Sequence, residues 1–175
     1  MRLFIAITFE EEIKKMLAEF GGRLEAAGIK GRFSAEENIH LTLAFLGESR
    51  REAELCRILG SLEGAAFPLE SGVLGRFRKQ GGDVLWLGLK KSQALGALYG
   101  QLVEKLAGAG FALEERPYQP HITLGRQVCF PSESLFYEFQ KNGPWFRTEA
   151  NRVSLMESCR AGGRLVYRER FRAEL

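Results

Sequence analysis

Two stretches of this chain share one pattern and decide its fold: HLTLAFLG at residues 40–47 and HITLGR at residues 121–126. The 175 residues include only two histidines and four threonines. Each histidine is followed by Thr two positions later and by Leu three positions later. Chance is a poor explanation for this match, and two copies of a motif indicate an internal duplication. We therefore expect a two-lobed domain with one site between the lobes.

Each motif lies in an apolar stretch that predicts a β-strand, where successive side chains point to opposite faces. Strict alternation puts Phe45 on the apolar face of the first strand, which should pack against helices. The residues predicted to share the polar faces are His40, Thr42 and Ala44 in the first strand and His121 and Thr123 in the second. Two such strands facing each other would bring two imidazoles and two hydroxyls into one cleft.

This set of side chains suits acid–base chemistry at a phosphate. Two histidines can act as general base and general acid, because an ordinary pKa near 6.5 makes both protonation states available at neutral pH. Threonine hydroxyls can donate hydrogen bonds to phosphate oxygens, and an arginine would neutralise charge that builds at phosphorus. A single His on a strand is more often a structural residue. The duplication reverses that estimate, because no other histidine occurs in the chain.

The rest of the sequence predicts helices between strands and hairpins, which indicates an α+β fold. Residues 131–142 are predicted to form a short helix or a turn-rich insert. Single strands are expected over 145–158 and 163–175, joined by a turn at Gly162–Gly163. The other predicted helices cover 10–28, 50–62 and 92–110, and the other predicted strands cover 3–9, 29–34, 38–47, 67–77, 83–89 and 121–130. No linker or low-complexity tract divides the chain, so we expect one domain over residues 1–175.

Composition limits the compartment and the partners. The three cysteines (Cys56, Cys129 and Cys159) are scattered, which argues for a reducing compartment and against a disulfide framework or a zinc site. No segment approaches the ~20 apolar residues of a membrane span. We expect a cytoplasmic monomer with no metal, no cofactor, no membrane contact and no protein partner. The net charge of +3 permits an anionic substrate. Basic residues gather at 75–79 (GRFRK) and near the C-terminus, where a solvated edge strand is the simpler interpretation.

The paired motifs resemble the two-histidine phosphoesterase superfamily, and specifically its RNA 2′,3′-cyclic phosphodiesterase branch (LigT-like, also called ThpR). The resemblance covers nearly the whole chain. Phe33 departs from it, because relatives often have Trp there, and we expect this change to affect packing only. The stretches that follow the family pattern in order are ENIHLTLAFLG, GRF, VLWLGL, RPYQPHITLGR and LMES…GGRLVY.

The resemblance implies a bilobal α+β fold with two antiparallel sheets facing a central cleft, helices outside and a pseudo-twofold internal repeat. It implies metal-independent hydrolysis of a terminal 2′,3′-cyclic phosphate, on an RNA 3′ end or a nucleotide, to a 2′-phosphomonoester. His40 would be the proton donor and His121 the base that activates water, although the motifs alone do not separate these roles. Thr42 and Thr123 would bind the phosphate.

Arg126 matches an arginine that would also contact the phosphate. Strict alternation puts it on the face opposite His121, so either Gly125 allows a local bulge or the side chain reaches around the strand end. Phe77 and Tyr118 are candidates to stack a terminal base, with simple packing at least as good an explanation.

Other functions remain open. The same chemistry could act on 2′–5′ oligonucleotides, ADP-ribose cyclic phosphate or small cyclic-phosphate nucleotides, or run backwards as a 2′–5′ RNA ligase. A non-catalytic nucleotide- or RNA-binding module is the alternative from another class. A serine or cysteine hydrolase fits less well, because no G-x-S-x-G motif occurs and no base is spaced to serve Cys129.

Overall fold

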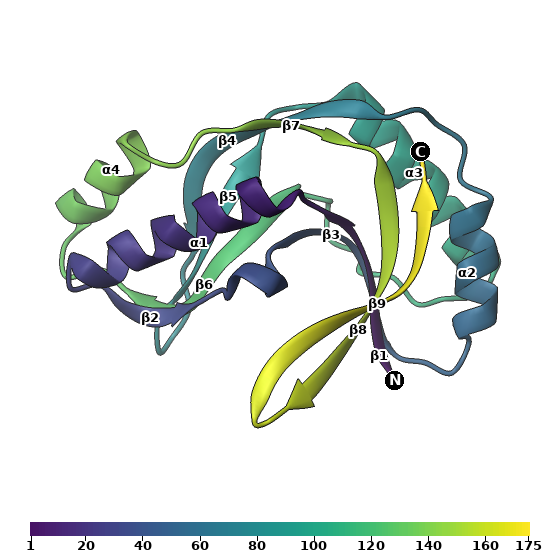
Figure 1. Cartoon of the computed structure of the whole chain (residues 1–175), viewed down its shortest axis with the longest axis horizontal. Helices are drawn as coiled ribbons and strands as arrows, with labels where there is room; N and C mark the ends of the chain where they lie inside the picture. Colours follow the sequence, from purple (N-terminus) through teal and green to yellow (C-terminus); the bar gives the residue numbers. More distant parts are fainter.

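The computed structural model describes residues 1–175 and confirms the expected two-lobed α+β architecture (Figure 1). None of its helices is long and apolar enough to cross a membrane. The helices are α1 (Glu11–Ala26), α2 (Glu52–Gly60), α3 (Gln93–Gly108) and α4 (Glu133–Lys141), with a 3₁₀ turn at Glu36–Asn38. The strands are β1 (Arg2–Thr8), β2 (Lys30–Phe33), β3 (His40–Glu48), β4 (Phe67–Phe77), β5 (Asp83–Leu89), β6 (His121–Cys129), β7 (Arg147–Ala150), β8 (Arg152–Ala161) and β9 (Arg164–Glu174).

The two motif strands lie at the centre of the sheet. The strand order is β7-β4-β5-β6-β3-β1-β8-β9, so three strands flank β6 on one side and three flank β3 on the other. The two halves are joined only where Leu41 pairs with Ile122, and β2 pairs with β6 beyond that point. The sheets of the two lobes therefore meet at a single bridge, with a histidine one residue before it on each strand.

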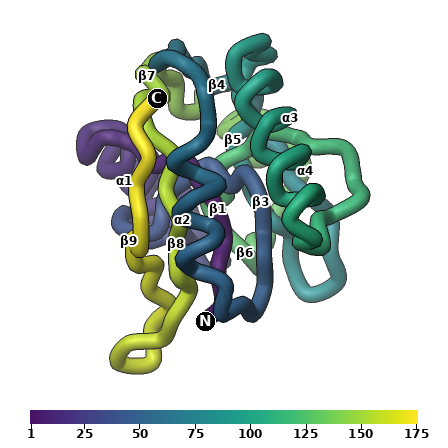
Figure 2. The backbone as a smooth tube through the Cα atoms, turned by 90° about the vertical axis from the view of Figure 1, so that its right-hand side faces the viewer, coloured from purple at the N-terminus to yellow at the C-terminus, as the bar shows by residue number.

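Helices cover each lobe, and two of them connect the lobes. α1 follows β1 in the chain but packs against β2 and β6, in the other half. α3 follows β5 but packs against α2, which covers β8 and β9. Figures 1 and 2 show α2 and α3 together at one side of the molecule, away from α1. Ser92 caps α3, because its hydroxyl accepts from the backbone N–H of Leu95, and a matching serine caps α4.

The buried apolar faces form one main cluster of 32 residues across both lobes. Leucines at Leu95, Leu98, Leu102 and Leu106 show the three- and four-residue spacing of a helix with one buried face, which is why 92–110 could be predicted. Residues 131–142 form the helical alternative, α4, with Phe136 buried.

The single strand predicted over 145–158 is wrong. The chain breaks at Asn151 into β7 and β8, which belong to different halves of the sheet. β7 pairs with β4 at one edge, whereas β8 pairs with β1 and β9 in the other half. The chain crosses between lobes at this break, which apolar alternation within one segment does not reveal.

Candidate active site

The antiparallel register of β3 and β6 brings the two motifs together. Because Leu41 pairs with Ile122, His40 lies opposite Thr123 on the neighbouring strand, and Thr42 lies opposite His121. In both strands the histidine and threonine are partly buried, and the residue between them is fully buried. The polar side chains of both motifs therefore share one face.

Both imidazoles are held in the same way. Nδ1 of His40 lies 2.7 Å from the carbonyl oxygen of Asn38, and Nδ1 of His121 lies 2.7 Å from the carbonyl oxygen of Gln119. A carbonyl only accepts, so each Nδ1 carries the proton and donates it. In the neutral tautomer, Nε2 of each ring therefore carries the lone pair that can take up a proton.

The two rings differ in their surroundings. His40 lies between Phe4 and Tyr167, with ring centroids 4.9 and 5.1 Å away. Its Nε2 is 2.9 Å from the hydroxyl of Thr42, which donates when the ring is neutral. His121 and Phe77 form a T-shaped contact with ring centroids 5.4 Å apart.

Burial lowers the pKa of His40 to about 4, against a backbone hydrogen bond to Asn38 that raises it. The nearby charges of Arg126 and His121 lower the pKa further. His40 is therefore neutral in the free protein at neutral pH.

Each motif strand contains a bulge, which moves the fifth residue after the histidine onto the cleft face. This residue is Phe45 in β3 and Arg126 in β6. The β1–β3 register shifts between Ile5 and Ala6, and the β5–β6 register shifts between Leu85 and Trp86. Two successive residues are consequently buried in each strand, Leu43–Ala44 and Leu124–Gly125.

The bulges settle the position of Arg126 and correct that of Phe45. Arg126 lies on the cleft side, as the bulge alternative at Gly125 requires. The prediction that Phe45 faces the helices is wrong, because Phe45 is 53% exposed and lines the cleft. Ala44, predicted on the polar face, is buried.

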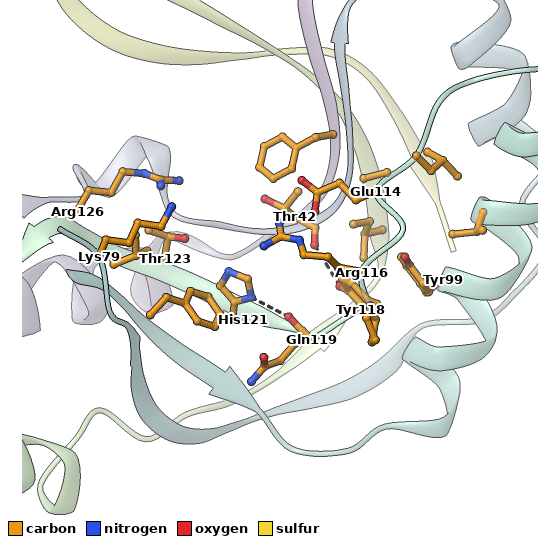
Figure 3. A pocket seen from close by; sticks show the side chains of 18 residues that line it. Thr42, Lys79, Tyr99, Glu114, Arg116, Tyr118, Gln119, His121, Thr123 and Arg126 are labelled. Atoms are coloured by element: carbon orange, nitrogen blue, oxygen red, sulfur yellow. Dashed lines mark hydrogen bonds and ion pairs between the residues drawn. The ribbon is translucent and has the colours of Figure 1, made fainter. Parts of the chain in front are cut away.

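A cavity of about 640 Å³ lies along this face, and most of the predicted site residues line it (Figure 3). His40 is not on its wall and is connected to it through the hydroxyl of Thr42. The predicted residues that line the cavity are Thr42, Phe77, Tyr118, His121, Thr123 and Arg126.

The two candidate stacking residues have different surroundings. Tyr118 stacks on Tyr99 with ring centroids 3.9 Å apart and donates its hydroxyl to the carbonyl oxygen of Thr42. Burial raises the pKa of Tyr118, so the hydroxyl stays protonated. Phe77 packs on Trp86 and His121 but keeps 37% of its surface exposed.

Phe45 and Lys79 are among the cavity-lining residues that sequence reasoning missed. Phe45 was hidden by the bulge, whereas the basic run at 75–79 was a visible signal for Lys79. The three cysteines are free thiols, and no group of three or more His, Cys, Asp or Glu side chains gathers anywhere in residues 1–175.

Comparison with known proteins gives the same family as the motifs. A family model described as "2'-5' RNA ligase superfamily" matches residues 13–161. This chain belongs to the 2′-5′ RNA ligase superfamily. An RNA 2′,3′-cyclic phosphodiesterase of Thermotoga maritima is 38% identical over 140 residues, which cover 76% of this chain and 73% of that protein. A protein of the same name from Escherichia coli is 34% identical and covers 73% of this chain and 72% of its own length.

Comparison with solved structures agrees with the superfamily assignment. The crystal structure of E. coli LigT complexed with 3′-AMP superposes with a TM-score of 0.80 at 28% identity, covering 99% of this chain and 97% of that one. The fold is thus shared over nearly the full length, including both motif strands.

Proposed function

We propose that residues 1–175 form one RNA 2′,3′-cyclic phosphodiesterase domain that acts by His/His acid–base catalysis without a metal. The observation that carries the proposal is that His40 and His121 lie on the same face of the paired strands β3 and β6, and that each donates from Nδ1 to a backbone carbonyl. The names of the T. maritima and E. coli relatives, and the 3′-AMP in the LigT crystal structure, support a nucleotide phosphate as the substrate.

In the proposed reaction, Nε2 of His121 takes a proton from water as the water oxygen attacks phosphorus. The bond between phosphorus and the 3′ oxygen breaks, and that oxygen receives a proton from Nε2 of His40. The products are a 2′-phosphomonoester and a free 3′ hydroxyl. Attacking and leaving oxygens lie on opposite sides of phosphorus, which suits a base and an acid on two neighbouring strands.

As the proton donor, His40 must be protonated, but its pKa of about 4 in the free protein leaves little imidazolium at neutral pH. A bound phosphate anion would favour the charged ring and offset the positive charge of Arg126. We therefore propose that substrate binding raises the pKa of His40 and prepares it as the acid. The hydroxyl of Thr42 can rotate to accept from Nε2–H in that state.

The remaining roles follow the chemistry of the side chains. The hydroxyls of Thr42 and Thr123 and the guanidinium of Arg126 would hold the non-bridging oxygens. Phe77 would offer its exposed surface to the terminal base, as one of the aromatic rings that line the cavity. Tyr118 has one ring face on Tyr99, so only its other face would be available to a base.

The test uses wild type, His40→Ala and His121→Ala in EDTA buffer. The substrate is an oligoribonucleotide ending in a 2′,3′-cyclic phosphate, and the position of the product phosphate is assigned by NMR. We expect a 2′-phosphate from wild type and losses of at least about 10²-fold in both variants. A 3′-phosphate product, or wild-type turnover that is lost in EDTA and restored by a divalent ion, would contradict the mechanism. Saturable substrate binding without turnover would instead support a binding module.

The monomeric state and a cytoplasmic location stay predictions. Light scattering behind a sizing column tests the first, and fractionation of cells that produce the protein tests the second. Incubation with a 2′-phosphate or cyclic-phosphate end and a free 5′ hydroxyl end measures any reverse ligation.

A further inference from the structure

Two arginines lie directly opposite each other where β2 pairs with β6. Arg32 is the register partner of Arg126, and both side chains are exposed. Opposed residues of an antiparallel pair project from the same face, and like charges at such positions are destabilising. Neither guanidinium forms an ion pair or hydrogen bond with another side chain. The fold thus tolerates a repulsion that a bound anion would relieve.

A third cation approaches from the β4–β5 turn. Figure 3 shows Lys79 and Arg126 extending toward the same part of the cleft, beside Thr123. The turn is fixed, because the backbone N–H of Lys79 donates to Asp83 and its carbonyl accepts from Gly82. The Lys79 side chain therefore extends from a backbone position that these hydrogen bonds fix.

The carboxylates near these cations are already paired. Asp83 and Glu133 bind Arg76, and Glu133 also binds Arg78. Glu114, the acidic residue on the cavity wall, lies 2.7 Å from Arg116. Lys79 has no ion pair with any of them, so Arg126 lies beside two other cations, Arg32 on β2 and Lys79 on the turn (Figure 3), and none of the three is paired with an acid.

One terminal cyclic phosphate carries a single negative charge, and the two motifs with Arg126 already supply groups for it. Arg32 is not on the wall of the cavity, but it lies beside Arg126, which is. Phe33 packs on Gly21 and Gly125, which keeps β2 in the register that opposes Arg32 to Arg126. A second phosphate, one nucleotide farther along a chain, would meet these extra cations.

We infer that Arg32 and Lys79, adjoining Arg126, form a subsite for the phosphodiester that links the terminal nucleotide to the one before it. The preferred substrate class is then an oligoribonucleotide end and not a mononucleotide. This inference rests on the proposed function, because it assumes that the terminal cyclic phosphate lies at the two histidines.

The test compares kcat/KM for three substrates: adenosine 2′,3′-cyclic phosphate, the dinucleotide ApA ending in the same cyclic phosphate, and that dinucleotide with an uncharged methylphosphonate linkage. Wild type should prefer the charged dinucleotide over the mononucleotide by about tenfold or more. Arg32→Ala and Lys79→Ala should each lose about tenfold on the charged dinucleotide and less than twofold on the mononucleotide, as expected for one charged hydrogen bond. The methylphosphonate linkage should lower kcat/KM of wild type by a similar factor and should lower kcat/KM of the variants much less.

Lys15→Ala is the matched control, because it removes one positive charge from the exposed side of α1. It should leave all three values unchanged. Equal losses of the Arg32 and Lys79 variants on mononucleotide and dinucleotide would overturn the subsite, and so would no loss on either.

Failure of the proposed function is distinguishable from failure of the subsite. If wild type turns over none of the substrates, the proposed function is wrong, and calorimetric binding of ApA 2′-phosphate and 2′-AMP then decides the subsite. Tighter binding of ApA 2′-phosphate that is lost in Arg32→Ala supports the subsite, and equal affinities overturn it.

Discussion

Phe45 and Arg126 occupy equivalent positions in the two halves of the sheet, five residues after His40 and His121. The exposure pattern from the histidine to this residue is the same in both strands, and a bulge turns both side chains into the cleft. One half therefore presents an aromatic ring where the other presents a cation. This difference gives a nearly symmetric cleft a direction, with an apolar end suited to a base and a charged end suited to phosphate.

Phe45→Ala should raise KM by about tenfold or more and leave kcat within about twofold. A base stacked on an aromatic ring contributes about 1–3 kcal/mol of binding, and Phe45 does not contact the reacting atoms in the proposed reaction. Steady-state kinetics with the cyclic-phosphate dinucleotide give both constants. Trp145→Ala, which removes another exposed aromatic ring away from the cavity, is the control. A fall in kcat with unchanged KM would assign Phe45 a different role.

The rate should depend on pH with a bell shape, because one histidine must be protonated and the other neutral. In the pH profile of kcat/KM, which reports the free protein, the inflection caused by His40 should lie near pH 4. In kcat it should lie at higher pH, because a bound anion disfavours loss of the proton and raises the pKa. Identical limbs in the two profiles would show that phosphate does not act on His40, and a flat profile from pH 5 to 9 would exclude the acid–base pair if chemistry limits the rate.

A substrate with sulfur in place of the 3′ oxygen separates acid from base. A thiolate leaves without a proton, since thiols ionise near pH 8.5. If His40 is the acid, His40→Ala should lose about 10²-fold or more on the oxygen substrate and less than tenfold on the sulfur substrate. His121→Ala should be impaired on both. The reverse pattern would exchange the two roles.

The sequence was sufficient for features that depend on local pattern. The H-x-T-L repeat placed four of the site side chains, because alternation is reliable over the first four residues of each strand. The leucine spacing in α3 likewise followed from burial of one helix face. The basic run at 75–79 marked the turn that carries Lys79.

Other features depend on contacts between distant segments. The bulges arise where β3 and β6 pair with β1 and β5, so a single strand's pattern predicts Phe45 on the wrong face and leaves Arg126 undecided. The opposition of Arg32 and Arg126 requires the register of β2 on β6. The break at Asn151 reflects partners in different halves of the sheet. Pairing register, unlike alternation, is set by tertiary packing.

His40 should make the protein less stable as pH falls. Its pKa is about 4 when folded and near 6.5 when unfolded, so the unfolded chain binds more protons between these values. The free energy of unfolding should therefore be highest above pH 6.5 and fall, by on the order of 3 kcal/mol from this residue, as pH drops to 4. Urea titrations at pH 7 and 4.5 should show a smaller difference in His40→Gln than in wild type. His121→Gln is the matched control, and an equal reduction in both variants would contradict the assignment to His40.

Gly75→Ala should disturb His121 from a distance. Gly75 pairs with Trp86, and a Cβ at this position would collide with the indole ring. Trp86 in turn packs against Phe77 and His121 at centroid distances of 5.2 and 6.0 Å. Displacement of the indole should therefore lower kcat by about tenfold and destabilise the fold by about 1–3 kcal/mol, the usual range for overpacking. Trp145→Phe leaves Trp86 as the single tryptophan, so its fluorescence reports the displacement directly.

Gly22→Ala provides the control for the same chemical change in open space. Gly22 lies within α1, and a Cβ there would have no neighbour within 4 Å. This substitution should stabilise the helix by about 0.5–1 kcal/mol and leave kcat and the Trp86 emission unchanged. If Gly75→Ala instead keeps wild-type kcat while the Trp86 emission shifts, the indole supports the fold without positioning His121.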